Sequence, residues 1–342
     1  MIPYGKQFID EDDIQAIVDT LKCKLITTGP KVEEFEQSVC DYVGANYGVA
    51  VSSGTAALHA SMFAIGINPG DEVIVPAITF VATANCVVYQ GGKPVFCDID
   101  PETLLIDITK IKKLITKNTK AIIAVDYAGM PCDYNALRKI TDKHNLFLIS
   151  DACHSIGAIK PSADITCYSF HPVKHITTGE GGMAVTNDIV LAEKMRGFRN
   201  HGMINGSMYN LGYNYRITDF QCALGITQLE KLNDWIIKRK EIADKYNKQL
   251  TVKRLRKGRN HVYHLYVVKV SDRDNIKQKL FEKGVGTQIH YRPVYYHPYH
   301  QKFKIDCPEA ENVYNEILSL PIYPGLTIEQ QDYVIECLEG LI

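Results

Sequence analysis

The sequence predicts an α/β protein with a large, mostly parallel sheet domain and a small C-terminal α+β domain. Short apolar runs alternate along the chain with amphipathic stretches of helical periodicity. Several runs are continuously apolar, which is typical of strands that a parallel sheet buries on both faces. Beyond residue 250 a charged stretch leads into a segment of different texture. We therefore expect a large domain over residues 1–235 and a small domain over residues 236–342.

The expected strands are short and regularly spaced. The uncharged run at 73–89 contains a proline and polar residues, which favour a strand, a loop and a helix over a membrane span. A long, polar-faced helix is expected from about 218 to about 250. The basic run at 251–259 is expected to be a solvated connection or a strand edge, and not a binding patch. The predicted strands are 47–51, 72–75, 94–97, 120–125, 146–150, 165–170 and 183–186.

Composition narrows the functional classes. The chain has 342 residues, of which 46% are hydrophobic, and this is enough to fill a substantial core. With 38 Lys and Arg against 39 Asp and Glu there is no basic excess, so nucleic-acid binding is not expected. The 10 cysteines form no Cys-x-x-Cys pair, which favours reduced thiols and no metal site. The N-terminus lacks the order of a signal peptide, so we expect a cytoplasmic protein.

One lysine, Lys174, lies among glycines and hydroxyl residues in the run 169–187. A lysine that forms a Schiff base must be uncharged part of the time, and short uncharged neighbours favour this by desolvation and tight placement. Most lysines are solvated surface charges, but these surroundings indicate a covalent anchor for a cofactor.

An aspartate, Asp151, ends the apolar run at 146–150. Ligands of parallel sheets bind beyond the carboxyl ends of the strands, so Asp151 is expected where a cofactor would lie. A carboxylate at this point holds a pyridine nitrogen protonated, and the resulting pyridinium is the electron sink of pyridoxal phosphate (PLP) chemistry. The alternative is a helix cap or a buried structural aspartate, which would be favoured if Lys174 were absent.

A third motif follows the strand at 47–51, where the chain enters a helix. Ser53, Gly54 and Thr55 place free amides and hydroxyls at the helix N-terminus, and the glycine permits close approach of an anion. Any capped helix can begin in this way, so the motif indicates a phosphate site only together with Lys174 and Asp151.

Together these motifs resemble the DegT/DnrJ/EryC1/StrS family of PLP-dependent nucleotide-sugar aminotransferases. This family is a branch of the fold-type I, aspartate aminotransferase-like superfamily, and the resemblance covers almost the whole chain. The resemblance implies this fold for the chain. It also implies PLP as the cofactor, with pyridoxamine phosphate as its intermediate form, and a homodimer with shared active sites. The matching segments are 28–36, 53–58, 79–83, 98–100, 151–154, 169–174, 212–216 and 221–225.

The resemblance also implies roles for single residues. Lys174 would hold the cofactor covalently and move the proton, and Asp151 would pair with the pyridinium. His154 stands where the family more often has a glutamine that bonds the phenolic oxygen of the cofactor. Phe80 would stack on the cofactor ring, although a core aromatic is nearly as good an interpretation.

The phosphate site that the resemblance implies draws on two subunits. Ser53, Gly54, Thr55 and Ser169 would hold the phosphate from one chain, and Asn214 would reach it from the partner chain. Arg216 could hold a substrate carboxylate or phosphate, but a structural ion pair is an equally good interpretation. An asparagine in an irregular loop is usually only a turn former, so the role of Asn214 depends on the resemblance.

Substrate choice is inferred from the segment that follows the lysine. Residues 176–182 resemble the subgroup that aminates C4 of a nucleotide-linked 4-keto-6-deoxyhexose, and 126–129 and 80–86 are most similar to the pseudaminic acid pathway enzymes. Viosamine and perosamine enzymes share most of these motifs. We expect glutamate as the amino donor and a UDP- or dTDP-linked sugar as acceptor, for polysaccharide biosynthesis. Residues expected around the sugar and nucleotide are Tyr4, Thr28, Gly29, Gln288, His290 and Tyr291, although interface packing would also explain the Tyr and His cluster.

Alternatives remain open at this point. The acceptor could be a keto-cyclitol, or the chain could be a non-catalytic, PLP-bound regulator on the same fold. Lys174 speaks against the dehydratases of the family, which would be expected to lack it. The segment between His154 and Ser169 is also shorter than in many relatives, which either opens the pocket or only trims a surface loop.

Overall fold

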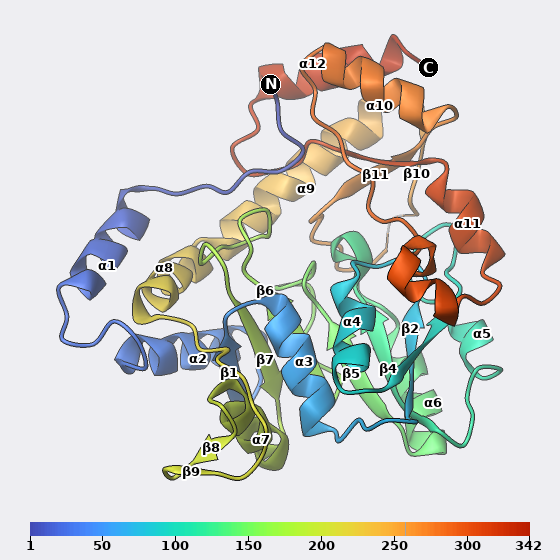
Figure 1. The fold of residues 1–342 in the computed structure, drawn as a ribbon. Helices are drawn as coiled ribbons and strands as arrows, with labels where there is room; N and C mark the ends of the chain where they lie inside the picture. Colours follow the sequence, from blue (N-terminus) through green and yellow to red (C-terminus); the bar gives the residue numbers. More distant parts are fainter. Residues whose placement is uncertain (257) are drawn as a thin grey trace.

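The computed structural model describes residues 1–256 and 258–342. Lys257, part of the connection expected at 251–259, lies outside the described residues. The large sheet has 7 strands in the order β1-β7-β6-β5-β4-β2-β3, with helices on both faces (Figure 1). These strands are β1 (Tyr47–Val51), β2 (Glu72–Pro76), β3 (Lys93–Cys97), β4 (Thr119–Val125), β5 (Phe147–Asp151), β6 (Ile165–Ser169) and β7 (Gly182–Thr186).

All the predicted strands of this sheet are confirmed, with ends that differ by at most one residue from those expected. The sheet is mostly parallel, as predicted: β7 alone runs antiparallel to its neighbours β1 and β6. The pairs β2–β3, β2–β4, β4–β5 and β5–β6 are parallel. The carboxyl ends of β1, β2, β4, β5 and β6 therefore meet at one edge of the sheet.

Successive residues of each strand face opposite sides of the sheet, which explains the continuous apolar runs. On β4, Ala121 and Ile123 pack into one core cluster, and Ile122 and Ala124 pack into another. The first cluster is covered by α3 (Gly54–Ala64), α4 (Ala82–Tyr89) and α7 (Ile189–Arg199), and the second by α5 (Ile108–Ile111) and α6 (Tyr134–His144).

The single helix predicted from 218 to 250 is wrong. The structure has two helices, α8 (Asp219–Glu230) and α9 (Leu232–Gln249), which are separated at Lys231. The Lys231 amide bonds to the carbonyl of Gln228, three residues back, so the regular α-helical pattern is interrupted there. Helix α8 is also not polar-faced, because it packs between α1 (Glu11–Leu21) and α2 (Pro30–Val43) and is buried over much of its surface.

The C-terminal elements form a second core above the large sheet in the view of Figure 1. A 3-stranded antiparallel sheet has the order β10-β11-β12. The first residues of the chain join this unit, because Ile2 pairs with Val285. The division near residue 236 stays our proposal, and it falls inside α9. The elements are β10 (Lys253–Arg254), β11 (Tyr266–Lys269), β12 (Ile317–Leu320), α10 (Arg273–Glu282), α11 (Pro308–Tyr314) and α12 (Ile328–Glu339).

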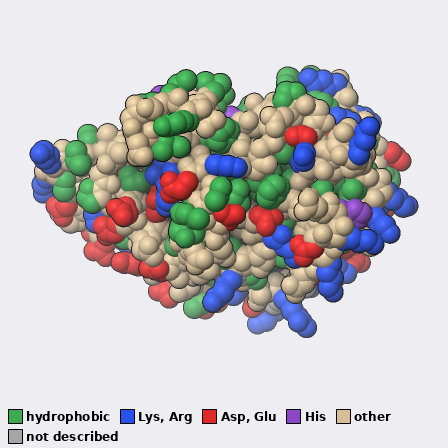
Figure 2. Space-filling view, turned by 90° about the horizontal axis from the view of Figure 1, so that it is seen from below, with side chains coloured by type: hydrophobic (Ala, Val, Ile, Leu, Met, Phe, Trp, Pro, Cys, Tyr) green, Lys and Arg blue, Asp and Glu red, His purple; other side chains and the backbone are tan. Residues whose placement is uncertain are grey.

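The face seen in Figure 2 carries acidic and basic side chains together with scattered hydrophobic ones. This mixture agrees with the formal net charge of −1. Within the described ranges, no helix is both long enough and apolar enough to cross a membrane.

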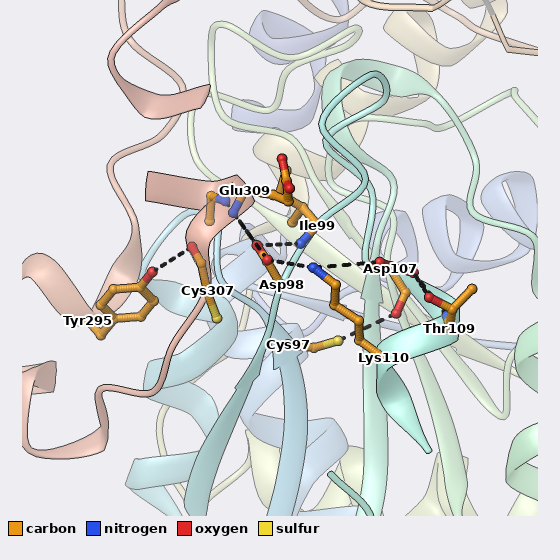
Figure 3. A network of polar contacts seen from close by, with 10 residues as sticks. Cys97, Asp98, Ile99, Asp107, Thr109, Lys110, Tyr295, Cys307 and Glu309 are labelled. Atoms are coloured by element: carbon orange, nitrogen blue, oxygen red, sulfur yellow. Dashed lines mark hydrogen bonds and ion pairs between the residues drawn. The ribbon is translucent and has the colours of Figure 1, made fainter. Parts of the chain in front are cut away.

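A buried carboxylate ties the C-terminal part of the chain to the large sheet (Figure 3). Asp98, directly after β3, accepts hydrogen bonds from the amides of Glu309 and Ala310 at 3.2 and 2.9 Å, at the start of α11. It also accepts one from the Lys110 amine at 2.7 Å. Asp98 therefore anchors the end of the segment 286–307, which runs past the site described below.

We expect Asp98→Ala to lower the free energy of unfolding by about 2–4 kcal/mol, because it removes a helix cap and leaves buried amides without partners. Chemical denaturation measures this. Lys110→Met is the matched control: it removes only a half-exposed ion pair and should change stability by about 1 kcal/mol or less. An equal loss in both variants would show that the ion pair, and not the cap, matters.

Candidate active site

Loops from five parallel strands converge at the carboxyl edge of the large sheet. Residues 52–54 follow β1, 77–80 follow β2, 126–129 follow β4, 152–155 follow β5 and 170–174 follow β6. The motifs that the sequence singled out are thus brought together by the strand order.

Lys174 lies in the turn after β6, where its amide bonds to the His171 carbonyl at 2.9 Å. Burial lowers the pKa of its amine, while the carboxylate of Asp151 opposes this shift. An amine that loses its proton more easily than a surface lysine is a better nucleophile and proton acceptor.

Asp151 is the last residue of β5 and is buried. Its Oδ2 accepts a hydrogen bond from the Thr83 hydroxyl at 2.7 Å, and its Oδ1 accepts one from the Cys153 amide at 3.3 Å. Thr83 in turn lies 2.7 Å from the Thr79 hydroxyl. Sequence reasoning assigned no role to these two threonines, although their spacing of four residues across the start of α4 put both hydroxyls on one side.

The turn between β1 and α3 forms a compact cradle. The Ser53 side chain caps α3 by accepting from the Ala56 amide at 3.1 Å. A Cβ added at Gly54 would lie 2.8 Å from the Ser169 Cβ, so only glycine lets this turn approach the end of β6. Thr55 follows in the first turn of α3, half-buried. Amides at a helix N-terminus beside hydroxyls suit a phosphate group.

His154 and Tyr291 contact each other on the next side of the site. The Tyr291 hydroxyl lies 3.1 Å from the His154 Nε2. Phe80 is 55% exposed and its ring centroid lies 5.9 Å from that of Tyr291. Phe80 is therefore not the core aromatic side chain that the sequence left open as an alternative.

The small sheet positions the other residues expected around the substrate. His290 Nδ1 lies 2.8 Å from the Ser319 hydroxyl, and the backbone of Gln288 pairs with Ser319. The ring centroids of Tyr4 and His290 are 5.3 Å apart. The structure thus gathers Tyr4, Gln288, His290 and Tyr291.

Thr28 and Gly29 lie elsewhere, in the turn between α1 and α2. The Gly29 amide donates to Asp219 Oδ2 at 2.8 Å, at the start of α8. In the part of the chain that is described, no hydrogen bond or ion pair joins this turn to Lys174. Asn214 is exposed, and its neighbour Arg216 donates to Asn200 Oδ1 at 2.6 Å, which is a structural bond within the loop.

Three residues that the sequence reasoning did not single out complete the cluster. The Tyr127 hydroxyl donates to the His290 carbonyl. The ring centroid of His264 lies 4.3 Å from that of His154 and 5.6 Å from that of His175. Burial lowers the pKa of His154, His175 and His264 well below the usual value, so these imidazoles are neutral. Only His175 could have been suspected, because it follows Lys174.

These groups fit PLP. The aldehyde of PLP needs an amine, and its pyridine nitrogen needs a carboxylate. Its phosphate needs an anion-binding turn, and its phenolic oxygen needs a hydrogen-bond donor. Lys174, Asp151 and the turn at Ser53–Thr55 match the first three. The buried Nδ1 of His154, which has no hydrogen-bond partner among the residues described, matches the fourth.

The comparisons with known proteins agree with this geometry. The chain is 37% identical over 377 residues to the spore coat polysaccharide biosynthesis protein SpsC of Bacillus subtilis (strain 168), covering 100% of this chain and 97% of SpsC. Helicobacter pylori PseC, an aminotransferase involved in the biosynthesis of pseudoaminic acid, superposes with a TM-score of 0.95 and 31% identity over 99% of this chain and 98% of PseC.

A further solved structure contains a form of the cofactor. NtdA from Bacillus subtilis with bound pyridoxamine phosphate has a TM-score of 0.92 and 35% identity, over 97% of this chain and 82% of NtdA. The profile of the DegT/DnrJ/EryC1/StrS aminotransferase family matches residues 7–339. The chain therefore belongs to this family and is a sugar aminotransferase that uses PLP, with pyridoxamine phosphate as the second form of its cofactor.

Proposed function

We propose that this enzyme transfers an amino group from glutamate to C4 of a UDP- or dTDP-linked 4-keto-6-deoxyhexose, giving a 4-amino-4,6-dideoxy sugar for polysaccharide biosynthesis. The observation that carries the proposal is the buried Lys174 amine of lowered pKa, which interacts electrostatically with Asp151 and with His290. Tyr291 of the same segment, 286–293, interacts with Asp151. Imidazole and phenol groups suit the hydroxyls and diphosphate of a sugar nucleotide. The segment 176–182, which resembles the subgroup that aminates C4, supports amination at that carbon. The likeness to PseC, an aminotransferase involved in the biosynthesis of pseudoaminic acid, supports a sugar as the acceptor.

When bound, PLP supplies an electron sink that stabilises negative charge at the carbon that loses its proton. The side chains of this chain would do the rest. The Lys174 Nζ accepts that proton and returns it, and the Asp151 carboxylate holds positive charge at the ring nitrogen. Ser53, Gly54, Thr55 and Ser169 would bind the phosphate, and Phe80 would stack on the ring.

The function can be tested in two half-reactions. Purified enzyme is converted to its pyridoxamine form with glutamate, and UDP- and dTDP-linked 4-keto-6-deoxy sugars are then offered, with and without a 2-acetamido group. Return of the visible absorption band with one sugar, and a 4-amino product by NMR, would support the proposal and name the nucleotide. Loading by glutamate without return of the band would favour a keto-cyclitol acceptor. No loading with glutamate would contradict the choice of glutamate as the amino donor.

We also propose a homodimer in which each active site receives Asn214 from the partner subunit. Helix α1, at the left in Figure 1, exposes the apolar residues Ile14, Val18 and Leu21 along one side. A second exposed apolar stretch includes Met208, Tyr209, Leu211 and Tyr213, directly before Asn214. Contiguous exposed apolar residues of this kind mark protein interfaces.

We expect Asn214→Ala to weaken retention of PLP roughly 10- to 100-fold, because a hydrogen bond to a charged phosphate is lost. Mixed dimers of Asn214→Ala and Lys174→Ala subunits should recover about one quarter of the wild-type activity, since each hybrid rebuilds one intact site. Asn210→Ala, an exposed asparagine of the same segment, is the control. Activity no higher than that of the two parents would mean that each chain builds its own site.

A cytoplasmic location is part of the proposal. All 10 cysteines are free, and most are buried. Free thiols in this number are typical of proteins kept in a reducing compartment. Fractionation of cells with an antibody to the protein would test it.

A further inference from the structure

One ring nitrogen of His154 has a partner and the other does not. Nε2 lies 3.1 Å from the Tyr291 hydroxyl. Nδ1 is buried and makes no hydrogen bond to any described residue. Since a buried polar atom without a partner is destabilising, Nδ1 marks a position where an atom of a ligand completes the site.

The protonation states of this pair follow from their surroundings. Burial lowers the pKa of His154 well below its usual value, and the Lys174 amine lowers it further. The ring is therefore neutral and carries one proton. Burial raises the pKa of Tyr291 well above its usual value, so its hydroxyl keeps its proton.

Counting donors decides between the two tautomers. If Nε2 carried the proton, it would donate to Tyr291, and both the Tyr291 O–H and the Nδ1 lone pair would lack partners. If Nδ1 carries the proton, the Tyr291 O–H donates to Nε2, and the Nδ1–H is the single open group. The other rings facing His154 are His264 at 4.3 Å and Tyr127 at 6.5 Å between centroids, and neither bonds to it.

We propose that Tyr291 is a positioning residue that fixes His154 in the Nδ1–H tautomer, so that Nδ1 donates a hydrogen bond to the anionic phenolic oxygen of PLP. The choice of PLP oxygen as acceptor rests on the proposed function, whereas the tautomer does not. Glutamine, the commoner residue at this position in the resemblance above, donates through its amide without any such requirement. A histidine in the same place needs a second residue to set its proton.

The tautomer can be observed directly. Full-length protein labelled with ¹⁵N-histidine is studied by NMR, with PLP bound and after its removal, and His154→Gln identifies the signal. We expect the Nδ1–H tautomer in the wild type and a rise of the Nε2–H form in Tyr291→Phe, which keeps the aromatic ring. An Nε2–H wild type, or an unchanged tautomer in Tyr291→Phe, overturns the proposal, whether or not the sugar activity is found.

A spectral titration tests the contact with the cofactor. The donor stabilises the phenolic oxygen most when the adjacent lysine-derived nitrogen carries no proton. Tyr291→Phe should therefore raise the pH at which the visible spectrum of bound PLP changes, by about one unit. In the His154→Gln background the same substitution should cause no further shift. Equal shifts in both backgrounds would mean that Tyr291 acts on the cofactor independently of His154, and would overturn the proposal.

Discussion

Lys174→Ala should bind PLP without the visible absorption band of the lysine-bound cofactor, and its turnover should fall by at least about 10²- to 10⁴-fold. The substitution removes both the covalent anchor and the group that moves the proton. Its effect on stability should be small, because burial already lowers the pKa of this amine. Absorption spectra, single-turnover kinetics and thermal unfolding measure the three quantities.

Lys194→Ala is the matched control for this variant. Lys194 is an exposed residue of α7 that donates to the Ala64 carbonyl at 3.1 Å, so its removal takes away a hydrogen-bonded lysine without touching the site. It should keep the visible band and the turnover. Sustained turnover by Lys174→Ala would remove the assignment of this residue.

The large sheet could be predicted because its information is local. The run 121–125 is apolar at every position, since Ala121 and Ile122 face different helical layers and both are buried. The break at Lys231 could not be predicted in the same way. Its amine pairs with Asp10 and Asp13, which lie over 200 residues earlier in the chain, and nothing within 218–250 marks that position.

The candidate active site could also be predicted only in part. Lys174, Asp151 and the turn at Gly54 could be proposed because each lies in a short motif of distinctive residue types. His264 could not, since it is common in kind and reaches the site only through the packing of the C-terminal part against the large sheet. Residues whose role depends on a tertiary contact leave no local pattern.

Asp151→Asn should lower turnover by roughly 10²- to 10⁴-fold, the equivalent of losing about 3–5 kcal/mol from a buried charge pair. The asparagine keeps the size of the side chain and an oxygen that can accept from the Thr83 hydroxyl, so the site should keep its shape and PLP should still bind. What is lost is the negative charge that holds the ring nitrogen protonated. Steady-state kinetics together with PLP titration separate these two effects.

Asp98→Asn is the matched control, because it also neutralises a buried aspartate after a strand of the same sheet. It should lower stability, since a charged cap and an ion pair become neutral, but it should leave turnover per folded molecule unchanged. If Asp98→Asn slows turnover as much as Asp151→Asn does, loss of buried charge in general would explain both. If only Asp151→Asn slows it while PLP stays bound, then the charge at the end of β5 acts on the chemistry, and the order of the strands is what puts it there.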